Sequence, residues 1–338
     1  MPLPLPLIGS LLALGGGAAL NIASSMRRRR AEEEGEDAEE AAQDPRTLLV
    51  VRTRSARQAL QNTLSAYGAR KLEVWQHSLG FFAKCLGRLE GASATDPYLM
   101  LEVEDTTLPP FGPERLARML RCGELVQARD DALQPEEEEE PFRSAEPEGY
   151  RRVPQWQHSL SLLELLDFAA RGHDPVSARM IDGTTDCPTL RWLAADEPEV
   201  PPEPIFGGMH ISEATIAALR GGEITDTTGL RSLLAVLESA QIIAASLLSS
   251  LEALDRASHP QMTALQTTLH INNNYARMSD LAMPTMELGP RRLVQRCYHL
   301  AAALMALTEA PVFAVDGRLE PGISRIADIG TIAAERLK

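Results

Sequence analysis

Residues 230–254 read LRSLLAVLESAQIIAASLLSSLEAL, and this stretch decides the fold class. Its main apolar side chains step by three and four, the spacing that places side chains on one face of an α-helix. They are Leu230, Leu233, Leu237, Ala240, Ala244, Leu247, Leu251 and Leu254. A second apolar file of Leu234, Ile243 and Leu248 widens this face, which favours a helix in a bundle over a two-stranded coiled coil. Only 13 uncharged residues separate Glu238 from Glu252, too few to span a bilayer.

Further helices are expected on both sides of this stretch. Residues 47–91 repeat the helical period, although two glycines, Gly68 and Gly80, weaken it; the apolar positions are Leu60, Leu64, Tyr67, Val74, Trp75, Leu79, Phe82, Leu86 and Leu89. The remaining predicted helices cover residues 113–133, 154–171, 212–220, 260–283, 290–309 and 321–336. The helix over 260–283 is predicted to run antiparallel to the one before it, joined through Ser258-His-Pro260.

Extended structure is predicted at only two places. Residues 98–103 could form a short strand, and Val312–Val315 precedes the turn signal Asp316-Gly317. The predicted fold class is therefore mostly α, a helical bundle with long amphipathic helices, one N-terminal transmembrane helix and at most a few short strands.

Charge and loop composition divide the chain into five predicted segments. They are an N-terminal transmembrane anchor with its basic flank (1–30), an acidic spacer (31–46), a long-helix segment (47–133), an acidic linker (134–153) and a helical bundle domain (154–338) with loop-rich residues 172–209.

The net charge of the 338 residues is −14, from 33 Lys and Arg against 47 Asp and Glu. Because phosphate binding requires a basic surface, this balance argues against nucleic acid as a partner. Aromatic residues make up only 4%, which also argues against base stacking. Arginine greatly outnumbers lysine, as is typical of proteins from GC-rich bacterial genomes.

The first 26 residues contain no charged side chain, and Arg27, Arg28, Arg29 and Arg30 follow directly. Residues 6–26 would form a helix of about 31 Å, close to the thickness of the hydrocarbon core of a bilayer. Because the arginines should stay on the cytoplasmic side, the sequence predicts a single-pass protein of the cytoplasmic (inner) membrane with its N-terminus outside. The alternatives are a cleaved signal peptide, which would carry its positive charge before the apolar run, and a helix that lies in the membrane interface.

One face of this apolar segment carries only small or polar residues at four-residue spacing: Gly9, Ala13, Gly17, Asn21 and Ser25. Small residues let helices approach closely in lipid, so this face could be a seam for helix–helix packing and self-association. The alternative is that small residues are simply common in membrane helices.

No motif in the sequence indicates catalysis or cofactor binding. There is no phosphate-binding GxxxxGK[ST] loop, no HExxH and no GxSxG, and the histidines have no metal-ligand spacing. Cys85, Cys122, Cys187 and Cys297 form no CxxC pair, which favours reduced, buried thiols in the cytoplasm. We therefore expect no cofactor, no metal site and no catalytic residue.

A pentapeptide occurs twice, as Trp75-Gln-His-Ser-Leu79 and as Trp156-Gln-His-Ser-Leu160. It indicates either a duplicated helix or two core helices with the same local packing, and the second interpretation is favoured because no longer repeat is visible.

Two segments resemble a loosely defined group of uncharacterised bacterial proteins. They are residues 59–89, with Tyr67-Gly-Ala-Arg-Lys-Leu-Glu-Val-Trp75, and residues 300–319, with Thr308-Glu-Ala-Pro-Val-Phe-Ala-Val-Asp-Gly-Arg-Leu319. The resemblance covers roughly 50 residues, implies membrane-associated helices, and carries no catalytic motif. This chain departs from the group because its Gly-rich apolar segment is at the front.

Three functions remain in order of preference. The first is a membrane-anchored cytoplasmic scaffold or interaction protein without catalytic activity, whose partners are membrane lipid and either a protein or a second copy. The second is an oligomerising, membrane-active helical protein in stress or defence. The third is an enzyme with a dispersed site in residues 172–209, near Asp174, Asp182, Asp186 and Cys187.

Overall fold

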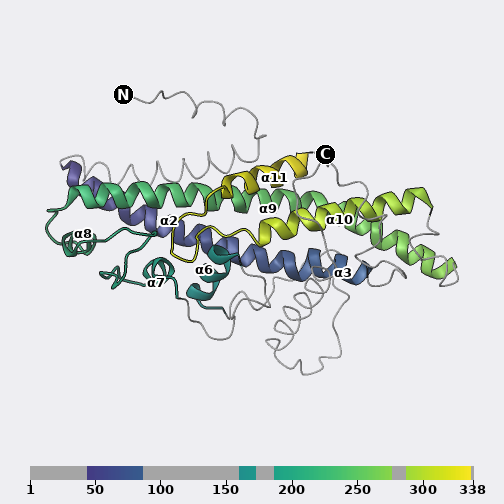
Figure 1. Ribbon diagram of the computed structural model, residues 1–338, viewed down its shortest axis with the longest axis horizontal. Helices are drawn as coiled ribbons and strands as arrows, with labels where there is room; N and C mark the ends of the chain where they lie inside the picture. The colour runs from purple at the N-terminus through teal and green to yellow at the C-terminus, as the bar shows by residue number, and fades with distance from the viewer. Residues whose placement is uncertain (1–43, 87–159, 173–185, 276–286, 336–338) are drawn as a thin grey trace, which may run out of the picture.

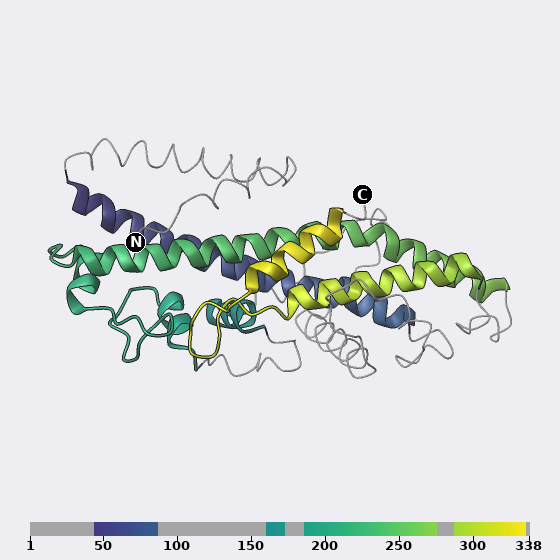
Figure 2. The ribbon, with the colours of Figure 1, turned by 45° about the horizontal axis from the view of Figure 1, so that its top comes forward.

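The computed structural model describes residues 44–86, 160–172, 186–275 and 287–335. This part of the chain is mostly helical and contains no strand. Long helices run side by side along the length of the molecule, and short helices lie toward one end (Figures 1 and 2). The mostly α prediction is confirmed, whereas the predicted N-terminal helix and the possible strand at residues 98–103 lie outside the described residues.

One continuous helical rod opens the described chain. It consists of α2 (Pro45–Glu73), the wide-turn π-helix η1 (Val74–Leu79) and α3 (Gly80–Leu86). The Asp44 carboxylate accepts a hydrogen bond from the Arg46 backbone N–H, which caps its start. Gly68 does not interrupt the rod; instead it allows α6 (Leu162–Arg171) to lie against it, since a Cβ there would be 2.3 Å from the Leu165 carbonyl oxygen.

The helix predicted over residues 154–171 begins later than expected. Leu160 and Ser161 are not helical, and Ser161 caps α6 through a reciprocal arrangement with Glu164. The second copy of the pentapeptide therefore does not continue into α6 as one helix, because its last residue precedes the cap. Gly172 ends α6 in the left-handed conformation.

Helix α9 (Thr227–Tyr275) is the longest described element and packs along α2 (Figure 1). Helices α10 (Leu288–Thr308) and α11 (Ile323–Glu335) pack against it as well. All eight apolar positions of its main file, from Leu230 to Leu254, have no exposed surface. The prediction of a one-sided core helix over this stretch is confirmed.

The antiparallel turn predicted at Pro260 is wrong, because the helix α9 continues past this proline to Tyr275. A proline inside a helix costs about 3 kcal/mol. Beyond it, Met262, Leu265 and Leu269 continue the buried file, and burying each of them is worth about 1.5–3 kcal/mol. Tertiary burial therefore outweighs the local effect of the proline.

The two segments before α9 carry short helices, α7 (Pro188–Ala194) and α8 (Glu213–Leu219). Helix α8 agrees with the helix predicted over residues 212–220 and is capped by the Ser212 hydroxyl, whereas α7 lies in the stretch 172–209 that was predicted to be rich in loops. The predicted extended segment near Val312 forms a narrow turn closed by a single bridge between Phe313 and Leu319.

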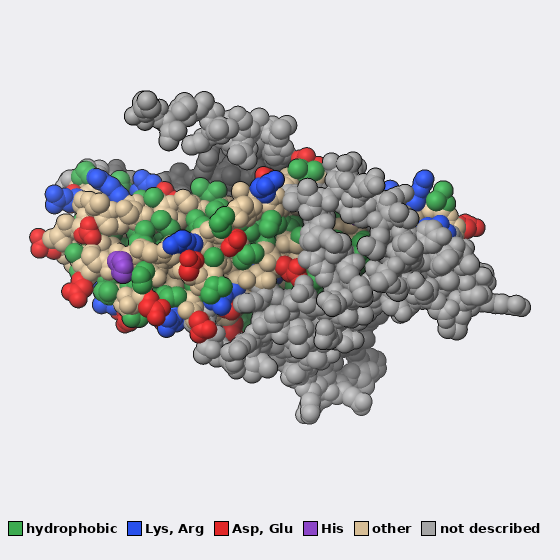
Figure 3. Space-filling model, in the orientation of Figure 1, with side chains coloured by type: hydrophobic (Ala, Val, Ile, Leu, Met, Phe, Trp, Pro, Cys, Tyr) green, Lys and Arg blue, Asp and Glu red, His purple; other side chains and the backbone are tan. Residues whose placement is uncertain are grey.

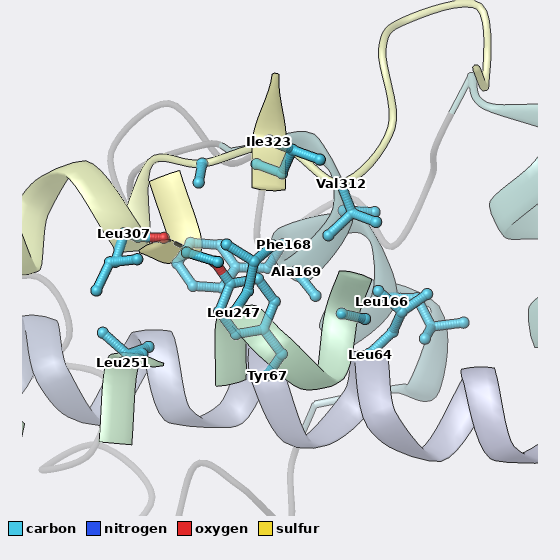
Figure 4. Packing of buried hydrophobic residues seen from close by; sticks show 14 of the residues in the cluster. Leu64, Tyr67, Leu166, Phe168, Ala169, Leu247, Leu251, Leu307, Val312 and Ile323 are labelled. Atoms are coloured by element: carbon cyan, nitrogen blue, oxygen red, sulfur yellow. Dashed lines mark hydrogen bonds between the residues drawn. The ribbon is translucent and has the colours of Figure 1, made fainter. Parts of the chain in front are cut away.

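A single hydrophobic cluster joins the long and short helices. Figure 4 shows its centre, where Tyr67 of α2 meets Phe168 of α6, Leu247 of α9 and Leu307 of α10. Helices α2 and α6 from the first part of the described chain therefore share one core with α9 and α10 from its second part.

Candidate functional site

The sequence-predicted site residues lie mostly outside the described part of the chain. This holds for the membrane flank Arg27, Arg28, Arg29 and Arg30, for the packing positions Gly9, Ala13, Gly17 and Asn21, and for Asp174 and Asp182. Asp186 and Cys187 are described, but Asp186 is exposed while Cys187 is fully buried at the start of α7. These two residues are neighbours in the sequence, but the first faces solvent and the second faces the core, so their side chains do not form one site. Within the described residues, no group of three or more His, Cys, Asp or Glu could hold a metal ion.

A buried amine is the most unusual polar group in the described core. Lys71 of α2 has no exposed surface, and its Nζ donates hydrogen bonds to the carbonyl oxygens of Ala169 (2.9 Å) and Ala310 (3.0 Å). The Ala169 oxygen lies in the last turn of α6 and the Ala310 oxygen lies two residues after the end of α10, so the amine joins both segments to α2. The ring of Tyr67 lies 4.4 Å away and that of Phe168 5.9 Å away.

Two opposing effects act on the charge of Lys71. The partial negative charge at the helix ends and the faces of the aromatic rings favour the ammonium form. Burial favours the neutral amine, and no carboxylate among the described residues pairs with it. Burial is the stronger effect, since it lowers the pKa of Lys71 well below its usual value. The neighbouring Tyr67 donates its hydroxyl to the Leu307 carbonyl oxygen (2.7 Å), and burial raises the pKa of Tyr67.

Two arginines of α2 hold short helices in the same way. The Arg57 guanidinium donates to the carbonyl oxygens of Trp192 (2.8 Å) and Ala195 at the end of α7, and it stacks 5.1 Å from the Trp192 ring centre. Arg54 donates through Nε to the Leu219 carbonyl oxygen (2.8 Å) at the end of α8. We call Arg54, Arg57 and Lys71 the capping row, because each satisfies carbonyl groups that a helix end leaves open.

A second polar cluster joins α2 and η1 to α9. The buried carboxylate of Asp255 accepts hydrogen bonds from Arg70 (2.6 Å) and from the Ser78 hydroxyl. Arg70 also pairs with Glu73 one turn along. Part of this cluster lies on a π-helix, an element that often accompanies functional sites. Its groups, however, bond to one another across the helix interface, so they hold the helices together. We call Arg70, Ser78 and Asp255 the Asp255 clamp.

Two thiols lie at the contact between α3 and α10. Cys85 and Cys297 are both buried, and the Cys297 thiol donates to the Gln261 carbonyl oxygen (3.3 Å). Burial, with a smaller contribution from Cys85 against an opposing one from Arg296, raises the pKa of Cys297 to about 12. Since the thiolate is the reactive form, Cys297 is not poised as a nucleophile.

The buried polar groups therefore stabilise the fold. The candidate functional site is a surface of the molecule that could bind a partner. We define the α9 face as the exposed side chains of α9 between Arg231 and Arg256. They are Ser232, Ala235, Ser239, Ile242, Ala245, Ser246 and Ser249. None of them is charged, and Ile242 near the middle is 70% exposed. Figure 3 shows one side of the molecule, where hydrophobic and uncharged side chains run between charged groups on the described part.

Helix α9 is also the one described helix that is long and apolar enough to cross a membrane. Its Thr227–Leu269 part contains an 18-residue window with a mean hydropathy of 1.6. The uncharged run between Glu238 and Glu252 is too short to span a bilayer by itself, but the longer apolar stretch of α9 remains hydrophobic on average even though it includes charged side chains. The core helix of a soluble protein meets the same criteria, and α9 does bury its leucines against α2, α10 and α11.

No family model matches the chain, and no curated protein or solved structure is significantly similar to it.

Proposed function

We propose that the protein is a membrane-anchored helical scaffold on the cytoplasmic side, which binds partners through its helical body. The structural observation that carries the scaffold role is the α9 face, an uncharged surface on the longest described helix. In this proposal the long helices form a bundle, and the capping row and the Asp255 clamp make it rigid. A rigid body with one open neutral face is suited to docking another helix.

The membrane anchor in this proposal rests on the sequence of the first 30 residues. An uncharged segment followed directly by Arg27, Arg28, Arg29 and Arg30 has the pattern of a retained span with its basic flank in the cytoplasm.

Cell fractionation tests the anchor. The full chain should remain in the membrane pellet after a wash at high pH, and deletion of residues 1–26 should release it into the supernatant. Deletion of residues 31–43, the acidic stretch directly before the described chain, is the control and should leave the protein in the pellet. A full chain that washes off would overturn the proposal, and a deletion variant that stays in the pellet would transfer the anchoring role to another helix.

Protease protection tests the orientation. Protease added outside intact cells should leave the part of the chain after the arginines undigested. Digestion of that part from outside would overturn the cytoplasmic placement.

The small-residue stripe in the first 26 residues supports a second candidate, a protein that oligomerises in the membrane and remodels it. Substitution of Gly9 and Gly17 by leucine should then abolish crosslinked oligomers of the full chain. Unchanged oligomers would remove this candidate.

A further inference from the structure

The exposed residues of α9 follow a second heptad pattern, opposite the buried one. Ser232, Ser239 and Ser246 are seven residues apart, and so are Ala235, Ile242 and Ser249. Together these two files step by three and four, which is the spacing at which one helix packs along another. The inward side of α9 already has such packing from α2 and α10. The outward side has the same geometry and is exposed.

Charged side chains mark both ends of this pattern. Arg231 lies 11 residues before Ile242 and Glu252 lies 10 residues after it, which corresponds to about 16 Å and about 15 Å along the helix. Neither side chain forms an ion pair within the described residues. At 100° per residue, Arg231 and Glu252 are both rotated in the same direction around the helix axis from Ile242, so they lie along the same edge of the α9 face.

We propose that the α9 face docks a second copy of this chain, antiparallel and related by a twofold axis at Ile242. In this arrangement Ile242 packs against its own counterpart, and Ala235 lies level with Ser249 of the second copy. Arg231 then lies within about one residue of the level of Glu252 of the second copy, and the symmetry makes this pair twice. A parallel arrangement would instead place Arg231 against Arg231 and Glu252 against Glu252.

The composition of the face favours a helix over lipid as the occupant. Four of its seven residues are serine and two are alanine, whereas interfacial membrane helices bury bulky apolar side chains. Small side chains let two helices approach to the short end of the usual distance of about 8–10 Å. The serine hydroxyls stay able to bond to their own helix backbone, as Ser239 does with the Ala235 carbonyl oxygen (2.8 Å).

The size of the face predicts a weak complex. The stretch between Arg231 and Glu252 is about 32 Å long, and a helix about 10 Å wide gives a footprint of about 300 Å² per copy. Stable dimers bury about 800 Å² per copy, so self-association should depend on concentration. The inference rests on the proposed function in one respect only: a membrane anchor would raise the local concentration of the face.

Disulfide crosslinking of the full chain tests the geometry. Wild type supplies the background, because it carries the buried Cys85, Cys187 and Cys297 together with Cys122, which lies outside the described residues. Ile242→Cys alone should crosslink strongly under mild oxidation, and Ala235→Cys should crosslink when mixed with Ser249→Cys. Ala235→Cys or Ser249→Cys alone should stay near the background. Equal crosslinking of all three single variants would show a parallel pair and refute the proposal, as would background levels for Ile242→Cys.

Charge reversal tests the end contacts independently. Arg231→Glu and Glu252→Arg should each weaken self-association about twofold to thirtyfold, since both surface pairs of the dimer are lost, and the double variant should restore it. Arg256→Glu is the matched control, because this exposed arginine is level with an uncharged residue, Thr228, of the second copy. An equal loss with Arg256→Glu, or no rescue in the double variant, would overturn the pairing. Membrane retention of these variants should match wild type, so failure of the dimer is distinguishable from failure of the anchor.

Discussion

Replacing Lys71 with methionine keeps the length of the side chain but removes the amine that joins the ends of α6 and α10 to α2. The carbonyl oxygens of Ala169 and Ala310 then lose a donor inside the core. Each unsatisfied buried group costs about 1–3 kcal/mol, so two of them predict a loss of about 2–6 kcal/mol in the free energy of unfolding at a pH where the amine is neutral in both the folded and the unfolded chain.

The pH dependence of this loss follows from the lowered pKa of Lys71. The folded protein releases the Lys71 proton at a lower pH than the unfolded chain, whose lysine pKa is about 10.4. Between the two values the unfolded state binds more protons, so raising the pH stabilises the fold. This stability is fully present above the unfolded value and is lost as the pH falls toward the folded value. The gap between wild type and Lys71→Met should therefore widen from about pH 7 to about pH 10, by at most about 1.4 kcal/mol per pH unit.

Urea unfolding followed by far-ultraviolet circular dichroism measures this gap at several pH values. Arg46→Met, at an exposed position of the first turn of α2, is the matched control and should show no such trend. A gap that stays constant or narrows as the pH rises would refute the reasoning, because it would mean that the helix ends and aromatic rings outweigh burial.

Three further predictions concern packing and reactivity. Arg57→Met should destabilise the protein by about 1.5–3 kcal/mol and raise hydrogen exchange in α7, whereas Arg52→Met, which loses only an exposed ion pair with Glu238, should cost no more than about 1 kcal/mol. Gly68→Ala should cost about 1–3 kcal/mol in urea unfolding, because its Cβ meets the backbone of α6, while Gly289→Ala, with nothing within 4 Å, should be neutral or slightly stabilising. Cys297 should react with iodoacetamide only after unfolding, and rapid labelling of the folded protein, detected by mass spectrometry, would contradict its raised pKa.

Periodicity predicted the part of the fold that burial decides. The file from Leu230 to Leu254 is buried throughout, and so are the predicted positions of the first rod from Leu60 to Phe82. These predictions succeed because each position depends only on which side of a helix faces the core.

Local signals failed where distant contacts outweigh them. Pro260 signals a helix end, but the buried side chains that follow it keep α9 continuous. Helix α6 begins later than its apolar spacing predicts, because Ser161 and Glu164 form their cap inside a stretch with helical spacing.

The capping row could not be predicted because its partners are backbone carbonyl groups, which any sequence supplies. Only Lys71 carries a signal in the sequence, because this charged residue lies on the buried file of α2, four residues after Tyr67 and three before Val74. The α9 face, by contrast, follows from the same periodicity that predicts the core, once the composition of the opposite side is considered.

The capping row also has a consequence for synthesis of the chain. The carbonyl groups that Lys71 binds belong to residues 98 and 239 positions later in the sequence. At about 5–20 residues per second, the ribosome delivers Ala310 about 12–48 s after Lys71. During that interval the amine remains hydrated and protonated, so α2 cannot complete its final environment until nearly the whole polypeptide has been made.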